Sequence, residues 1–99
     1  MKITQVDVFQ IDIPLIPAIS KYMPKIYDIT LCRIMTDEGL TGIGESTVYH
    51  LTEASRTELK ATAEAYVGQD PLAVDPFAQP MLFECALHDT TAQAYGIPV

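Results

Sequence analysis

The sequence predicts a small α+β domain, in which a three-stranded antiparallel meander is followed by helices. Segments rich in β-branched residues fill the first half of the chain, and a tight-turn signal at 37–39 joins two of them. The second half has helical spacing and no later strand. Because strands and helices do not alternate, we expect helices on one side of an antiparallel sheet, in one domain covering residues 1–99.

The first strand is predicted at about residues 2–13, where apolar and polar residues alternate. The alternation changes parity between Val8 and Phe9. This change indicates either a bulge or a strand that is covered on both faces. Pro14 and Pro17 should end the strand, since proline cannot donate to a ladder.

Residues 16–27 show no period and are predicted to form a long loop. Aromatic, thioether and cationic groups on such a loop suit a lid that faces a substrate. An ordinary loop would use the same groups to cover its own base, and the sequence leaves both interpretations open. The candidate lid residues are Tyr22, Met23, Lys25 and Tyr27.

The second and third strands are predicted at about 28–36 and 40–46, as a hairpin whose turn ends at Gly39, a residue free to adopt positive φ. The pair Gly42 and Gly44 resembles part of a phosphate-binding loop. The spacing fails, however, because a third glycine would have to replace Thr47 and no P-loop lysine follows. We expect these glycines to let the strand bend or pack closely.

Helices are predicted at about 52–67 and 76–95. The first helix has two alternative N-cap residues. One is Thr52, and the other is Ser55, which would form a capping box with Glu58. One apolar face is expected from Leu59, Ala63, Tyr66 and Val67.

The second helical region should begin at the N-cap signal Asp75-Pro76, and Pro80 interrupts it, so the firm helix is expected at 81–95. Gly96 and Pro98 are stop signals. Its apolar face is expected from Leu82, Cys85, Ala86 and Ala92, or from Leu87 and Ala94.

Charge and composition exclude some functions. Six basic and thirteen acidic residues give a net charge of −7, which argues against a nucleic-acid surface. No segment has the length of a signal peptide or of a membrane span, so we expect no membrane association and a cytoplasmic location. Cys32 and Cys85 both lie in apolar runs, and both are predicted to be buried, reduced thiols.

Candidate catalytic and metal-binding residues are few. Glu84 and His88 are four residues apart on a helix, but two ligands make a weak metal site, so a surface ion pair or a second-layer contact is the favoured interpretation. His50 follows the third strand in a loop, where it is either solvated or in contact with substrate. No nucleophile, base and orienting group occur in a convincing order. We therefore predict no catalytic residue and no metal site in this chain.

Four segments, in this order, resemble one family: MKITQVDVFQIDIPL, ITLCRIMTDEGLTGIGES, GQDPL and ECALHDTTAQAYGIPV. They are similar to the N-terminal capping domain of the enolase superfamily, of the mandelate racemase and muconate lactonizing type. The sequence departs from the family pattern at His88, where tryptophan is common, and at Ala92-Gln93, where Gly-Lys is usual. The segment 75–83 is also shorter than in many members. These departures concern the subgroup.

The resemblance implies an enzyme whose C-terminal TIM barrel, missing here, carries the acid/base residues and the carboxylates for Mg²⁺. It implies proton abstraction α to the carboxylate of a small substrate, in a racemase, dehydratase or cycloisomerase. The fragment alone should be inactive, and Glu45, Glu84 and Asp89 should not serve as metal ligands.

For this domain the resemblance implies substrate specificity and closure. Residues 16–27 correspond to a lid at the barrel mouth, and residues 47–50, with Tyr49 and His50, correspond to a second segment beside it. An apolar surface left without its barrel should self-associate, so a homo-oligomer is expected. The alternative is a stand-alone binding or oligomerisation module, which a natural stop after Val99 would favour.

Overall fold

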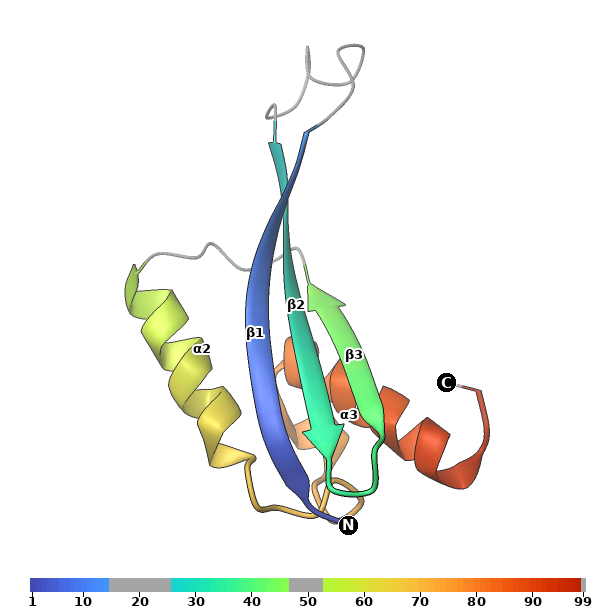
Figure 1. Cartoon of the computed structure of the whole chain (residues 1–99). Helices are drawn as coiled ribbons and strands as arrows, with labels where there is room; N and C mark the ends of the chain where they lie inside the picture. The colour runs from blue at the N-terminus through green and yellow to red at the C-terminus, as the bar shows by residue number, and fades with distance from the viewer. Residues whose placement is uncertain (15–25, 47–52, 99) are drawn as a thin grey trace.

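The computed structural model describes residues 1–14, 26–46 and 53–98 of the chain (Figure 1). In these residues three strands precede the helices, which confirms the predicted α+β class, and no barrel is present. The elements are β1 (Ile3–Pro14), β2 (Ile26–Thr36), β3 (Thr41–Ser46), α2 (Glu53–Ala65), the 3₁₀-helix η1 (Pro76–Ala78) and α3 (Met81–Tyr95).

The strands form an antiparallel sheet in the order β1-β2-β3, as expected of a meander. In the turn between β2 and β3, Gly39 has a φ of 80° and donates to the carbonyl of Thr36 at 3.2 Å. The N–H of Thr36 in turn donates to the carbonyl of Leu40 at 3.0 Å. A positive φ strains any residue with a Cβ, so the predicted glycine turn is confirmed.

A bulge in β1 was one of two predictions for the step between Val8 and Phe9, and its position is wrong. The pairs Val8–Cys32 and Phe9–Leu31 follow one another without a break, and the register shifts instead between Ile3 and Gln5. Among the described residues nothing covers the second face of the strand, because Phe9 remains 41% exposed there. The parity change therefore marks apolar side chains on the open face of the sheet.

The hydrophobic core lies between the inner face of the sheet and the helices. Phe83 of α3 is fully buried, and its ring centroid lies 5.2 Å from that of Tyr66, which follows α2. Burial of a large apolar side chain stabilises the fold by roughly 1.5–3 kcal/mol. The buried cluster comprises Ile3, Cys32, Ile34, Leu59, Ala63, Tyr66, Leu82, Phe83, Ala86 and Leu87.

The two glycines of β3 allow α3 to lie directly against the strand (Figure 1). A Cβ on Gly42 would lie 2.5 Å from the carbonyl oxygen of Ala86, and one on Gly44 would lie 2.7 Å from the amide nitrogen of Ala86. Real Cβ atoms do not approach backbone atoms so closely. The prediction that these glycines permit close packing is confirmed.

Side chains of α3 also bind the open edge of β3. The N–H of Ile43 donates to Asp89 Oδ2 at 2.8 Å, and Gln93 Nε2 donates to the carbonyl of Thr41 at 2.6 Å. Unpaired backbone groups on an edge strand invite pairing with another chain, and these two bonds satisfy two of them. Sequence reasoning missed this role of Asp89 and Gln93, because it depends on where the helix lies.

The first helix is shorter than predicted. It begins at Glu53, so Ser55 lies inside it and the Ser55 capping box is wrong, while Thr52 lies outside the described residues. It ends at Ala65, where the chain turns away, and Val67 is consequently 48% exposed rather than part of the apolar face. The other three residues predicted for that face are buried: Leu59, Ala63 and Tyr66.

The second helical region is divided at Pro80, as predicted. The carboxylate of Asp75 accepts from the N–H of Phe77 at 3.1 Å, but the helix that it caps is only the short η1. The firm helix α3 spans Met81–Tyr95 and ends at Gly96, with a φ of 67°. Neither predicted apolar face is fully right, because Cys85 and Ala94 are exposed. The buried residues of α3 are Leu82, Phe83, Ala86, Leu87, Thr90 and Ala92.

The two cysteines differ, and the prediction that both are buried is wrong for Cys85. The side chain of Cys85 lies over Gly44, which belongs to the edge strand β3. No further described strand lies beyond β3 to cover Cys85. Cys32, on the central strand, is fully buried. Loss of solvation there, together with the nearby charge of Asp7, raises the pKa of the Cys32 thiol to about 12.

Thiol labelling should therefore distinguish the two residues. At pH 8 a thiol-reactive dye should modify Cys85 in the folded chain and leave Cys32 unmodified, because the thiolate is the reactive species. In denaturant both should react. A Cys85→Ser variant should lose the native-state reaction, and rapid labelling that survives this substitution would contradict the assignment.

Candidate functional site

The end of the sheet that carries the predicted lid segments is the candidate functional site. β1 and β2 meet there in the pair Pro14–Ile26, and β3 ends beside β2 in the pair Thr30–Ser46. In Figure 1 these strand ends point the same way. The sequence segments that follow Pro14 and Ser46 are therefore both attached to this end of the sheet.

The structure describes few of the predicted lid residues themselves. Five of them lie outside the described residues: Tyr22, Met23, Lys25, Tyr49 and His50. Tyr27 is an exception, because its backbone pairs with Ile13 inside β2. The predicted loop of residues 16–27 is therefore too long at its end. The strand starts at Ile26 because β1 continues to Pro14 and offers a ladder partner for each added residue.

Glu84 and His88 lie side by side on the surface of α3, at the distance of the predicted ion pair. Glu84 Oε1 lies 3.6 Å from His88 Nε2, and both side chains are about one-third exposed. The His88 ring also meets the ring of Phe77 edge-on, with 5.1 Å between centroids. In the described ranges no group of three or more His, Cys, Asp or Glu residues converges as a metal site would require.

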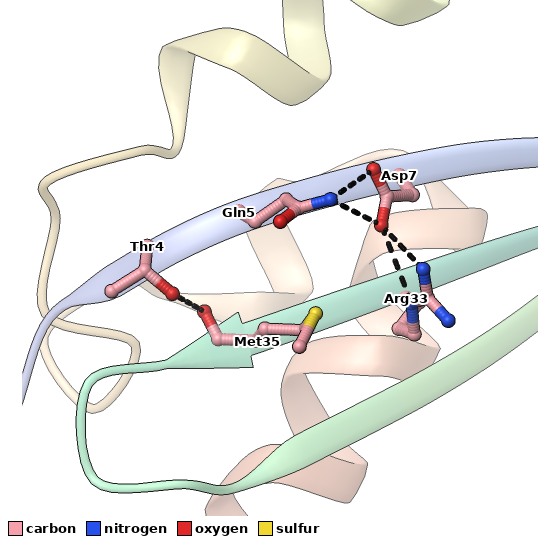
Figure 2. Close-up of polar contacts among 5 residues, drawn as sticks. All are labelled: Thr4, Gln5, Asp7, Arg33 and Met35. Carbon is pink, nitrogen blue, oxygen red and sulfur yellow. Dashed lines mark hydrogen bonds and ion pairs between the residues drawn. The ribbon is translucent and has the colours of Figure 1, made fainter.

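A polar cluster that the sequence analysis did not identify lies on the open face of the sheet (Figure 2). Asp7 Oδ2 accepts from Arg33 Nη2 at 2.8 Å, and Gln5 Nε2 lies 2.9 Å from both carboxylate oxygens. The Arg33 guanidinium also lies 5.1 Å from the centre of the Phe9 ring. Opposite charges on neighbouring strands were the available signal, but the register was needed to pair them.

These contacts lower the pKa of Asp7, first through the hydrogen bond from Gln5 and then through that from Arg33. A carboxylate with a lowered folded-state pKa adds stability above its unfolded pKa of about 3.9. That stability is lost as pH falls through the folded-state pKa.

The free energy of unfolding of the wild type should fall below about pH 4, and we expect Asp7→Asn to make this fall smaller. Urea unfolding across that range measures it, with exposed Asp70→Asn as the control. Equal acid sensitivity in wild type and Asp7→Asn would contradict the assignment.

A groove of about 650 Å³ lies between β1 and α2. Its β1 side is a run of consecutive strand residues, and its α2 side combines two buried apolar residues with two exposed cations. It is lined by Val6, Asp7, Val8, Phe9, Gln10, Arg56, Leu59, Lys60 and Ala63. In the part of the chain that the structure describes, no helix is long and apolar enough to cross a membrane.

No protein-family model matches the sequence, and no curated protein matches it. Solved structures do match. A protein of the mandelate racemase/muconate lactonizing enzyme group from Roseovarius nubinhibens ISM, complexed with magnesium, is 32% identical, with a TM-score of 0.69 over 96% of this chain and 30% of that chain. A member of the enolase superfamily from the same organism is 26% identical, with a TM-score of 0.66 over 95% of this chain and 29% of that chain.

A third structure is similar in fold. Dipeptide epimerase from Enterococcus faecalis, complexed with Mg and the dipeptide L-Leu-L-Tyr, is 23% identical, with a TM-score of 0.73 over 96% of this chain and 32% of that chain. This chain thus spans about a third of the length of the structures that it matches. The meander, the helices on one face and these matches agree: over about a third of their length, this chain has the fold of enolase-superfamily proteins of the mandelate racemase and muconate lactonizing type, consistent with their N-terminal domain.

Proposed function

We propose that this chain is the capping and substrate-specificity domain of an enzyme that abstracts a proton α to a carboxylate. The observation that carries the proposal is the attachment of both predicted lid segments to one end of the sheet. Both segments therefore leave the sheet at the same end, from strands that are held in one ladder. Loops held on a rigid scaffold are where binding residues concentrate in proteins.

The reaction itself is assigned to the rest of the parent protein. The described residues of this chain hold no convergent set of carboxylates or histidines for a metal. Two of the matching structures are magnesium complexes, and the one that is 32% identical supports Mg²⁺ as the cofactor of the parent. Abstraction of a proton next to a carboxylate develops negative charge, and a divalent cation is suited to stabilise it. Whether the parent is a racemase, a dehydratase or a cycloisomerase depends on the residues of the barrel.

The contribution of the capping domain is closure and selection. A lid that covers the site excludes water, which strengthens the electrostatic interactions inside. Within the lid segments, Lys21 or Lys25 is the proposed partner of a substrate carboxylate. Tyr22 and Met23 are proposed to shape the space around it. Tyr49 and His50 are proposed to contact the substrate from the second segment.

The isolated chain should be inactive. With Mg²⁺ and a panel of acid sugars and amino-acid derivatives, we expect no turnover, because the proposed acid/base residues belong to the barrel. Clear turnover by the purified 99-residue chain would contradict the proposal.

A domain exchange tests the lid. In a chimera, this chain would replace the matching part of the magnesium-bound Roseovarius nubinhibens protein that is 32% identical to it. The chimera would be assayed with the same panel of substrates. We expect Lys25→Ala or Tyr22→Ala in the chimera to raise KM or change substrate preference, as expected of residues that contact the substrate. Glu38→Gln, in the exposed turn at the opposite end of the sheet, is the control. An active chimera with the same selectivity in all three variants would contradict the lid assignment.

A further inference from the structure

The backbone of β1 is open along the side that faces α2 (Figure 1). The N–H of Ile43 points out of the sheet, since it donates to Asp89. Its ladder partner Arg33 therefore turns its own N–H and carbonyl toward β1, where it pairs with Asp7. The residues of β1 on either side of Asp7 therefore turn their N–H and carbonyl groups away from β2. The backbone groups that face the open edge are those of Val6, Val8 and Gln10.

Among the described residues, backbone hydrogen bonds cover this edge only near the start of β1. The N–H of Ile3 donates to the carbonyl of Gln69 at 2.8 Å, and the N–H of Gly68 donates to the carbonyl of Ile3 at 2.8 Å. Past the register shift, no backbone bond joins Val6, Val8 or Gln10 to a described residue outside the sheet. A strand laid along this edge would continue the pairing that residues 68–69 begin.

The groove beside this edge has the size and lining of a peptide site. Its volume of about 650 Å³ lies within the usual range of ligand pockets, roughly 300–1,000 Å³. Leu59 and Ala63 are buried at its base, and Val6 and Val8 are only partly buried. An extended segment would find backbone partners on β1 and apolar contacts beneath.

The charge of the groove selects its occupant. Although the chain has only six basic residues against thirteen acidic ones, two of the basic residues, Arg56 and Lys60, lie one turn apart on α2 and line this groove. Arg56 Nη2 donates to Gln10 Oε1 at 2.7 Å, so the cation lies against the open strand. Among the described lining residues Asp7 is the one acid, and it is already paired with Arg33. The unpaired charge along the groove is thus positive.

We propose that the groove between β1 and α2 binds an extended, acidic peptide segment of a partner polypeptide, which adds a strand to β1. Main-chain bonds to Val6, Val8 and Gln10 hold the segment, as in other cases of strand addition to a sheet edge. Its carboxylates lie beside Arg56 and Lys60. This interaction is separate from the lid, and it does not depend on the proposed enzymatic function.

The test is a titration of the ¹⁵N-labelled 99-residue chain with the blocked peptide acetyl-Thr-Glu-Val-Glu-Val-Glu-Thr-amide. We expect saturable chemical-shift changes at the amides of Val6, Val8 and Gln10, and slower hydrogen exchange there. A peptide with lysine in place of each glutamate should bind at least about tenfold more weakly, because like charges disfavour the complex. N-methylation of alternate peptide amides should abolish binding, because it removes the donors that a strand needs.

Matched variants of the chain separate the groove from general charge effects. Arg56→Gln with Lys60→Gln should weaken binding of the acidic peptide about fivefold or more, and Lys2→Gln, outside the groove, should leave it unchanged. All three residues are exposed, so the variants should keep the dispersed spectrum of the folded chain. Equal binding of the lysine peptide, or no saturable shift at millimolar peptide, would overturn the proposal. So would peptide-free, concentration-dependent shifts at the same amides, which would put a second copy in the groove.

Discussion

Replacing Gly44 with alanine should lower the free energy of unfolding by about 3 kcal/mol or more, which is at or above the usual cost of overpacking. The added Cβ would overlap the carbonyl oxygen of Leu82 and lie 2.7 Å from the amide nitrogen of Ala86. Both are backbone atoms of α3, so no side-chain rotation relieves the clash and the helix must move. Urea unfolding followed by circular dichroism measures the change.

The matched control for this experiment is Gly39→Ala in the same hairpin. A Cβ on Gly39 meets nothing within 4 Å, but the residue has a positive φ. Its replacement should cost about 1 kcal/mol, from backbone strain alone. Gly42→Ala should resemble Gly44→Ala, since its Cβ would lie 2.5 Å from the carbonyl oxygen of Ala86. If Gly44→Ala were no more costly than Gly39→Ala, the close approach of α3 to β3 would be refuted.

Truncation of Phe83 to alanine should cost about 3–5 kcal/mol, the range typical of large-to-small changes at buried aromatic residues. Phe83 is fully buried and packs against Tyr66, so its removal leaves a cavity where α3 and the end of α2 meet. Domains of this size are stable by only about 5–15 kcal/mol, so the loss is a large share of the total. The measurement is the urea midpoint at low temperature, with the slope checked for two-state behaviour.

Phe77→Ala is the natural comparison for Phe83→Ala. It removes the same side chain from a position that is 79% exposed, in η1. The change should cost less than about 1 kcal/mol, most of it from the ring contact with His88. Similar losses in the two variants would mean that the core is not centred on Phe83.

How far the sequence predicts the site depends on which part of it is considered. The two lid segments stay a prediction, which rests on the lack of period in residues 16–27 and on the family resemblance. The strand register attaches both segments to one end of the sheet. The Asp7–Arg33 cluster and the groove beside Arg56 were not predicted. Each brings together residues more than twenty positions apart, and no local pattern specifies such a pairing.

The sequence by itself determined the features that depend on local backbone preference. Gly39 ends a hairpin turn because glycine tolerates positive φ, and Pro80 and Gly96 bound α3 because one lacks an N–H and the other accepts the left-handed conformation. Alternating and helical periods then gave the order of strands and helices.

Only the tertiary structure decided features that depend on a neighbour distant in sequence. Cys85 has an apolar setting in the sequence but is exposed, because the sheet ends at β3 beneath it. Asp89 caps the edge of β3 because Gly42 and Gly44 let α3 approach within hydrogen-bonding distance. Burial and edge pairing are properties of two elements in contact, and one strand or helix alone does not encode them.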